Sequence, residues 1–361
     1  MAKATNLTEG REELKQRLAD GEYRSSVDVI LDTVGRILQK LTRRPRPPAF
    51  WISALAIALL VSLVAFLASL LTDALSRDAY LTIILGGTLI FLNLVIARST
   101  FRRTFDTLQK KLLDGLESNA GLTGLHAWLR GAADIKWPVL LGLFTYVLYV
   151  AFILPDPIAA PSPIETIIVG GFMLWWTGFL IYYMFLFVLL PLRLGRCQFK
   201  LHTEDPVSTE VLLDWSKMMS FAAYMFAFML ATGTLFTATA ATFRLRTLIF
   251  IIPRWLPLIT LFVVNQMAMS GVITRSKRKS LNEVEAQMAA LRPTGDPPEH
   301  ENMQTLLWLW DYHDRIIGSR GSFLHLRGIL NLVNTLLIPL LAFLVANRQA
   351  LFELVGWSPW T

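Results

Sequence analysis

The residue types best suited to binding a metal lie together in the C-terminal quarter of the chain. His300, Asp311, His313 and Asp314 offer imidazole nitrogens and carboxylate oxygens, which are common metal ligands in proteins. Ligands on one helix must share a face, but at 3.6 residues per turn His313 falls on the apolar side, whereas Asp311 and Asp314 fall together elsewhere. We therefore predict a packing histidine on a solvated helix, with no metal and no cofactor.

Catalytic residue types are missing from the long apolar segments of the sequence. None of the five histidines, and no Asp, Glu or Lys, lies in the interior of such a segment. This pattern excludes haem ligation between membrane helices, an intramembrane aspartyl pair, a carboxylate proton relay and a retinal Schiff base. The chain also lacks a phosphate-binding loop and an H-E-x-x-H helix. We predict that the protein is not an enzyme.

Arg254 is the one charged residue within an apolar segment, and a proline lies on either side of it. Its long side chain can reach the outer headgroups from about 9 Å inside the membrane, with Trp255 as an interfacial anchor. Alternatively, the guanidinium lines a cavity that binds an anion, or it pairs with Glu165 or Asp156 at the ends of neighbouring segments. Both interpretations remain open at this point.

Neutral polar and aromatic residues are the other candidates for an intramembrane role. They serve either as hydrogen-bonded packing contacts between helices or as the lining of a hydrated pathway. The candidates are Thr232, Thr234, Thr237, Asn265, Gln266, Asn331, Asn334, Trp175 and Trp176.

Seven apolar segments carry these candidates, and each is long enough to cross a hydrocarbon core of about 30 Å. In a solvent without water, such segments must form helices whose backbone groups are satisfied internally. The fold is therefore predicted to be all-α, a polytopic bundle of about seven transmembrane helices with amphipathic cytoplasmic helices. The segments cover residues 50–72, 80–97, 137–154, 165–191, 219–242, 248–271 and 328–347.

The connections between these segments alternate in positive charge. From the N-terminus to the C-terminus they carry 10, 1, 7, 0, 4, 2, 8 and 1 Lys plus Arg residues. Basic connections stay in the cytoplasm, so the N-terminus is predicted inside and the C-terminus outside a cell inner (plasma) membrane. The net charge of +7 is then explained by the lipid bilayer, and no nucleic acid is expected as a partner.

This topology predicts four regions. Residues 1–49 form a cytoplasmic amphipathic helical region, and residues 50–271 form six transmembrane helices with cytoplasmic loops at 98–136 and 192–218. Residues 272–327 form a cytoplasmic helical hairpin, and residues 328–361 form the seventh transmembrane helix with a short outside tail. The single cysteine, Cys197, is predicted to face the cytoplasm, where an internal disulfide is impossible.

Two cytoplasmic stretches have a clear helical period. In the first, an apolar stripe contains Val27, Leu31 and Leu38, with Asp28 and Asp32 on the opposite, polar side. This helix either lies in the membrane interface or packs against other cytoplasmic helices. In the second, an apolar face runs between two basic pairs, which predicts that the second transmembrane helix continues into the cytoplasm. The pairs are Arg102 with Arg103 and Lys110 with Lys111.

The predicted hairpin has one apolar stripe on each helix. The first helix carries Leu281, Val284, Met288 and Leu291, and the second carries Met303, Leu306, Trp310, His313 and Ile317. The hairpin either packs within the molecule or associates with a partner, which is another copy of the chain or a cytoplasmic protein. The candidate partner surface comprises Leu281, Val284, Met288, Leu306 and Trp310.

Together these features predict a non-enzymatic, multi-pass inner-membrane protein whose cytoplasmic helices mediate assembly, anchoring or sensing. The alternative is a channel or transporter with a neutral polar pathway through the helical bundle.

Overall fold

The computed structural model describes residues 2–43, 46–71, 77–119, 121–152, 171–202, 205–240, 245–291 and 300–319. These residues form helices and their connections, and the only β pairing among them is an isolated bridge between Leu116 and Phe199. The predicted all-α class is thus confirmed for this part of the chain.

Four of the described helices are long and apolar enough to cross a membrane, so the chain is a membrane protein. They are α3 (Phe50–Leu71), α4 (Arg77–Thr107), α8 (Gly171–Leu194) and α10 (Leu245–Leu291). A fifth is added if α5 (Leu122–Ala133) and the first residues of α6 (Lys136–Phe152), which meet at a bend of 55°, form one broken span. The predicted segment 219–242 runs past the end of α9 (Glu210–Ala240), and the predicted segment 328–347 lies outside the described residues.

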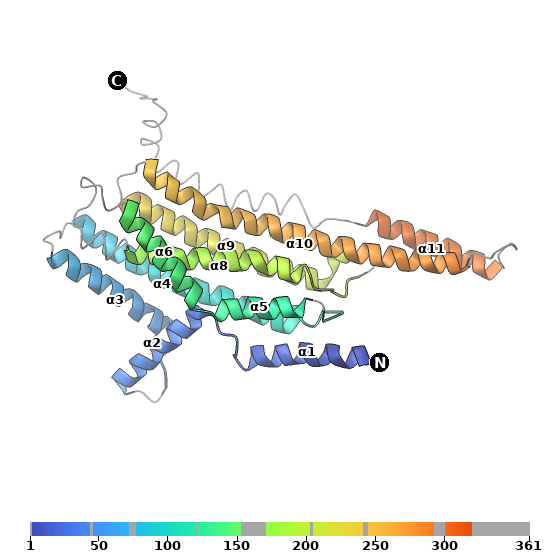
Figure 1. Cartoon of the computed structure of the whole chain (residues 1–361), viewed down its shortest axis with the longest axis horizontal. Helices are drawn as coiled ribbons and strands as arrows, with labels where there is room; N and C mark the ends of the chain where they lie inside the picture. Colours follow the sequence, from blue (N-terminus) through green and yellow to red (C-terminus); the bar gives the residue numbers. More distant parts are fainter. Residues whose placement is uncertain are drawn as a thin grey trace, which may run out of the picture.

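The long helices lie side by side along the longest axis of the molecule (Figure 1). At the right-hand end of this view the bundle continues into further helices, which we call the basic end because the basic connections meet there. The basic end contains α1 (Ala2–Ala19), η1 (Leu108–Leu112), α5, η3 (Pro206–Ser208), the C-terminal part of α10, and α11 (His300–Gly318).

The bundle carries a band of exposed apolar side chains. On α3 this band runs from Trp51 to Leu71, and on α10 it runs from Leu256 to Met267. Exposed apolar residues on α6, α8 and α9 continue the band around the bundle. In a membrane protein these side chains contact lipid, because hydrocarbon chains are as apolar as leucine. The band therefore indicates where the membrane meets the bundle.

Small residues bring α6 and α8 into close contact. A Cβ atom added to Gly178 would lie 2.5 Å from the Cα of Gly142, so only glycine fits at this crossing. Glycine at a helix crossing allows the two backbones to approach and gain van der Waals contact, which is the main source of packing energy in lipid. This contact joins α8 to the second half of the bent helical pair.

Helix α2 (Ser26–Thr42) lies obliquely to the long helices (Figure 1). Ser25 caps its N-terminus by accepting a hydrogen bond from the amide of Asp28. Val27 and Leu31 are buried, as the apolar stripe predicts, but Asp28 is buried too, although it belongs to the predicted polar side. Farther along the helix, Leu41 is exposed. The first half of α2 therefore packs on the bundle, while its second half presents apolar surface outward.

Helices α10 and α11 form the part of the basic end that extends farthest (Figure 1). Val284 and Met288 of α10 are buried against Leu309 and Ile316 of α11. Leu281, Leu291, Leu306 and Tyr312 complete this cluster. The two helices thus share an apolar seam that is separate from the main core.

Candidate functional site

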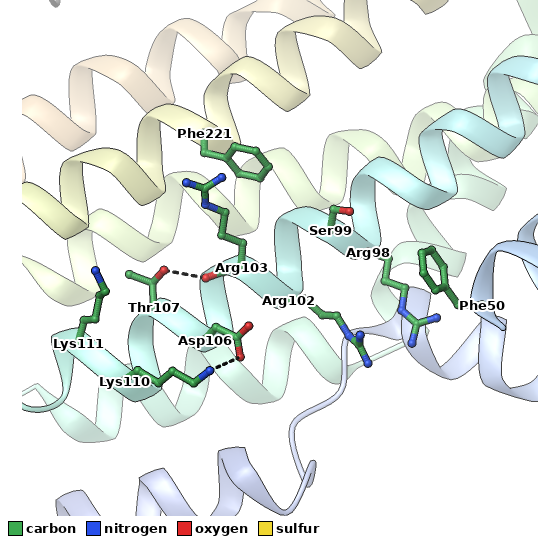
Figure 2. A pocket seen from close by; sticks show the side chains of 10 residues that line it. All are labelled: Phe50, Arg98, Ser99, Arg102, Arg103, Asp106, Thr107, Lys110, Lys111 and Phe221. Atoms are coloured by element: carbon green, nitrogen blue, oxygen red, sulfur yellow. Dashed lines mark hydrogen bonds and ion pairs between the residues drawn. The ribbon is translucent and has the colours of Figure 1, made fainter.

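A positively charged cavity lies along α4 and η1 at the basic end (Figure 2). It has a volume of about 430 Å³, and we call it the basic groove. Five of its lining residues are cationic and one is anionic. The lining residues are Phe50, Arg98, Ser99, Arg102, Arg103, Asp106, Thr107, Lys110, Lys111 and Phe221.

Helical geometry aligns the charged side chains of the groove. Arg98, Arg102, Asp106 and Lys110 follow one another at intervals of four residues, which places them in one row along the helix. Ser99, Arg103, Thr107 and Lys111 form the adjacent row. The α-helix of α4 changes to the π-helix η1 at Leu108, and such π-helical turns are frequent at functional sites.

Arg98 is the deepest cation of the groove, with a side chain only 9% exposed. Its Nε lies 2.8 Å from Oδ1 of Asp28, which forms an ion pair although the N–H does not point at the oxygen. The other carboxylate oxygen of Asp28 accepts a hydrogen bond of 2.7 Å from the Ser25 hydroxyl. The guanidinium also lies 4.4 Å from the ring centre of Phe50, a cation–π contact. The Nη1 atom of Arg98 is buried without a hydrogen-bond partner among the described residues.

At the far end of the groove, side chains of α4 and η1 contact α9. Lys111 forms an ion pair of 2.9 Å with Asp214, whose carboxylate also lies 4.0 Å from Lys217. Arg103 points toward Phe221 and lies 4.2 Å from its ring centre (Figure 2). These contacts connect α4 and η1 to α9 through side chains that also line the groove.

The charges of the groove are not balanced. Arg98 has Asp28 beside it, Lys111 has Asp214, and Lys110 lies 4.0 Å from Asp106. Within the part of the chain that the structure describes, Arg102 and Arg103 have no carboxylate within 4 Å. The groove therefore has a net positive charge and suits an anion.

Sequence reasoning noted the basic pairs of α4 and η1 but did not identify the groove. The available signal was the four-residue spacing of Arg98 and Arg102 directly after an apolar segment. Phe50 and Phe221, which come from two other helices, could not have been found from local spacing.

The polar residues predicted inside the membrane region have different environments. Asn265 is buried, and its side-chain oxygen accepts a hydrogen bond of 2.9 Å from Trp215 Nε1. The hydroxyl of Thr232 donates to the carbonyl of Phe228 at 3.0 Å within α9. Gln266 Oε1 and Trp176 Nε1 are buried without a partner among the described residues. Trp175 packs against Phe179 with ring centres 4.3 Å apart.

The other intramembrane candidates are not brought into a described site. Asn331 and Asn334 lie outside the described residues, as do the side chains of Thr234, Thr237 and Arg254. Their predicted roles remain predictions.

His313 lies between the two helices of the hairpin rather than among metal ligands. Its nearest acidic groups are Glu285 at 3.8 Å and Asp314 at 3.4 Å, and Asp311 pairs with Arg315 at 2.7 Å. Over the described ranges, no group of three His, Cys, Asp or Glu side chains could hold a metal ion.

Packing within the hairpin buries part of the predicted partner surface and leaves part of it exposed. Val284 and Met288 are buried in the seam and Leu306 packs beside them, whereas Trp310 is 60% exposed. On α11, the exposed apolar residues recur at intervals of four, three and seven residues, which places them on one face of the helix. We call them the outer stripe, which comprises Met303, Leu307, Trp310 and Ile317, with Trp308 exposed beside it.

Cys197 is buried where the connection after α8 packs on the basic end. Burial raises the pKa of its thiol to about 11, although the nearby positive charge of Arg275 lowers it. The thiol is therefore protonated at neutral pH, and a protonated thiol is a poor nucleophile.

In comparisons with known proteins, no family model, no curated protein and no solved structure matched this chain. The function is therefore inferred from its own residues.

Proposed function

We propose that this protein is a non-enzymatic, multi-pass inner-membrane protein that assembles through the helices of its basic end. In this proposal about seven helices span the membrane and the basic end faces the cytoplasm. The observation that supports assembly is the outer stripe of α11, an apolar surface that the rest of the described chain leaves exposed.

The position of the outer stripe supports contact with protein rather than lipid. The band of lipid-facing residues on α10 ends at Met267, and the hairpin seam begins at Leu281. These residues are about 21 Å apart along the helix, at 1.5 Å per residue. The stripe thus lies beyond the membrane, where exposed aromatic and aliphatic side chains mark protein interaction sites.

A second copy of the chain is the partner that this geometry favours. Copies inserted in the same orientation hold their hairpins at the same height above the membrane. Their identical stripes can then meet about a two-fold axis, as in most homo-oligomers. Confinement to the membrane also raises the effective concentration of one stripe near another.

The test is a pair of substitutions within the stripe. Leu307→Ser with Trp310→Ser should shift the purified protein from a dimer to a monomer in light scattering and weaken association at least about tenfold, since buried tryptophan often dominates an interface. Gln304→Ser, on an exposed position of the same helix, is the control and should leave the dimer intact. An oligomeric state that is the same in the wild type and the double variant would overturn the proposal.

A channel or transporter is the second candidate function. A hydrated pathway would satisfy the unpartnered polar atoms of Trp176 and Gln266. However, Gly195, directly after α8, packs beside Ala268 of α10, so Trp176 lies about 25 Å along the bundle from the level of Gln266. Two isolated polar atoms at such different depths support a continuous pathway less well than the stripe supports assembly.

A further inference from the structure

The basic groove lies where the lipid-facing band ends. Phe50 lines the groove, and the next residue, Trp51, is the first exposed apolar residue of α3. Phe221 lines the groove on α9, and the exposed residues Tyr224 and Phe228 follow it one and two turns later. Two separate helices thus pass from the groove directly into the membrane-facing surface.

The donors of the groove fit a phosphate group. Arg102 and Arg103 are exposed and without a carboxylate partner in the described chain, and the Ser99 hydroxyl lies in the row of Arg103. Arg98 also lines the groove, and its buried Nη1 has no hydrogen-bond partner within the described part of the chain. Guanidinium groups bind phosphate oxygens through two parallel hydrogen bonds, which makes arginine well suited to this anion. The volume of about 430 Å³ lies within the usual range of ligand sites, about 300–1,000 Å³.

We propose that the basic groove binds the phosphate group of an anionic phospholipid headgroup. Arg102 and Arg103 supply the principal charge, Arg98 supplies a buried donor, and the acyl chains lie along the apolar surfaces that begin at Trp51 and Tyr224. A soluble phosphate offers the same oxygens but makes no contact with the adjoining apolar surface. The position of the groove therefore favours a lipid as the source of the phosphate group.

The experiment measures how many phosphatidylglycerol molecules stay bound to the purified full chain in native mass spectrometry, with phosphatidylcholine as the reference lipid. Arg102→Gln with Arg103→Gln should weaken phosphatidylglycerol retention about tenfold, because each guanidinium forms charge-assisted hydrogen bonds. Lys200→Gln with Arg278→Gln is the matched control. It also removes two exposed positive charges from the basic end but lies outside the groove. Retention in the control should match the wild type.

A gain-of-binding variant separates this proposal from simple misfolding. Among the described residues that line the groove, Asp106 is the only carboxylate, so Asp106→Asn should strengthen phosphatidylglycerol retention by removing a repulsive charge. A damaged protein would not bind more tightly. To test whether the groove binds a soluble phosphate instead, inorganic phosphate is added to the lipid-free protein in detergent, and the change in melting temperature is measured.

Each outcome has a defined meaning. Loss in the groove pair, retention in the control pair and gain in Asp106→Asn support the proposal. Equal loss in both double variants would show diffuse attraction to the basic end and overturn it. A melting shift with inorganic phosphate, together with no preference for phosphatidylglycerol, would overturn the lipid as the source.

Discussion

At the scale of single residues, the contact between Asp28 and Arg98 decides how α2 joins the bundle. Their side chains are 11% and 9% exposed, so each charge has lost most of its water. A buried charge without its partner is strongly destabilising, because desolvation is no longer offset by attraction. The ion pair therefore holds the N-terminal turn of α2 in place beside the basic groove.

We expect Asp28→Asn to lower the free energy of unfolding by about 3 kcal/mol, because it leaves the Arg98 guanidinium buried and unpaired. Asn keeps the size of the side chain and can still bond the Ser25 hydroxyl, so the change acts on charge alone. The measurement is the thermal unfolding of the purified protein in detergent, followed by tryptophan fluorescence.

Asp32→Asn is the control, since Asp32 forms an exposed ion pair of 3.3 Å with Arg24. Exposed pairs contribute little, and the expected loss is below about 1 kcal/mol. If both variants melted at the same temperature, the ion pair would not anchor α2.

The burial of Asp28 also shows what local periodicity omits. The spacing of Val27 and Leu31 placed Asp28 correctly on another side of the helix, but that side faces Arg98 of α4. A contact between residues so distant in the sequence is not encoded in the 3.6-residue period. Burial of polar side chains depends on which helix packs nearby, and a single sequence does not specify this.

At the scale of elements, the hairpin shows where pattern and packing differ. All four predicted stripe residues of α10 belong to the seam cluster. On α11 the seam contains Leu309 and Ile316, whereas the predicted residues Trp310 and Ile317 are exposed. The segment from Leu306 to Trp310 is apolar on every side, so hydrophobicity alone does not choose its buried face.

The buried and exposed faces of α11 predict different effects for substitutions at two nearby leucines. Leu309 is 3% exposed and Leu307 is 60% exposed. Leu309→Ala should destabilise the hairpin by about 2–4 kcal/mol through lost burial and a cavity, and it should speed amide hydrogen exchange across α11. Leu307→Ala should leave the exchange nearly unchanged in the monomeric protein. Faster exchange in Leu307→Ala than in Leu309→Ala would reverse the assigned faces of α11.

At the scale of the whole molecule, composition predicted the membrane class and the all-helical fold. Long uncharged segments permit only helices in lipid, so these conclusions follow from solvation and do not require a particular packing. The described structure supports four or five of the seven predicted spans. The basic groove was not predicted, because it combines α3, α4, η1 and α9. Such a site exists only after the helices have assembled.

The charge alternation predicts that the basic end faces the cytoplasm, and this orientation can be tested directly. Single cysteines are introduced at Ser76, in a predicted outside connection, and at Asn282, on an exposed position of α10, both in a Cys197→Ser background. A membrane-impermeant maleimide should label Ser76→Cys in intact cells and Asn282→Cys only after permeabilisation. The opposite result would place the arginines of the basic groove on the outer leaflet. The groove would then meet a surface without the negative potential of the cytoplasmic leaflet, which is the long-range attraction that would concentrate anionic headgroups around it.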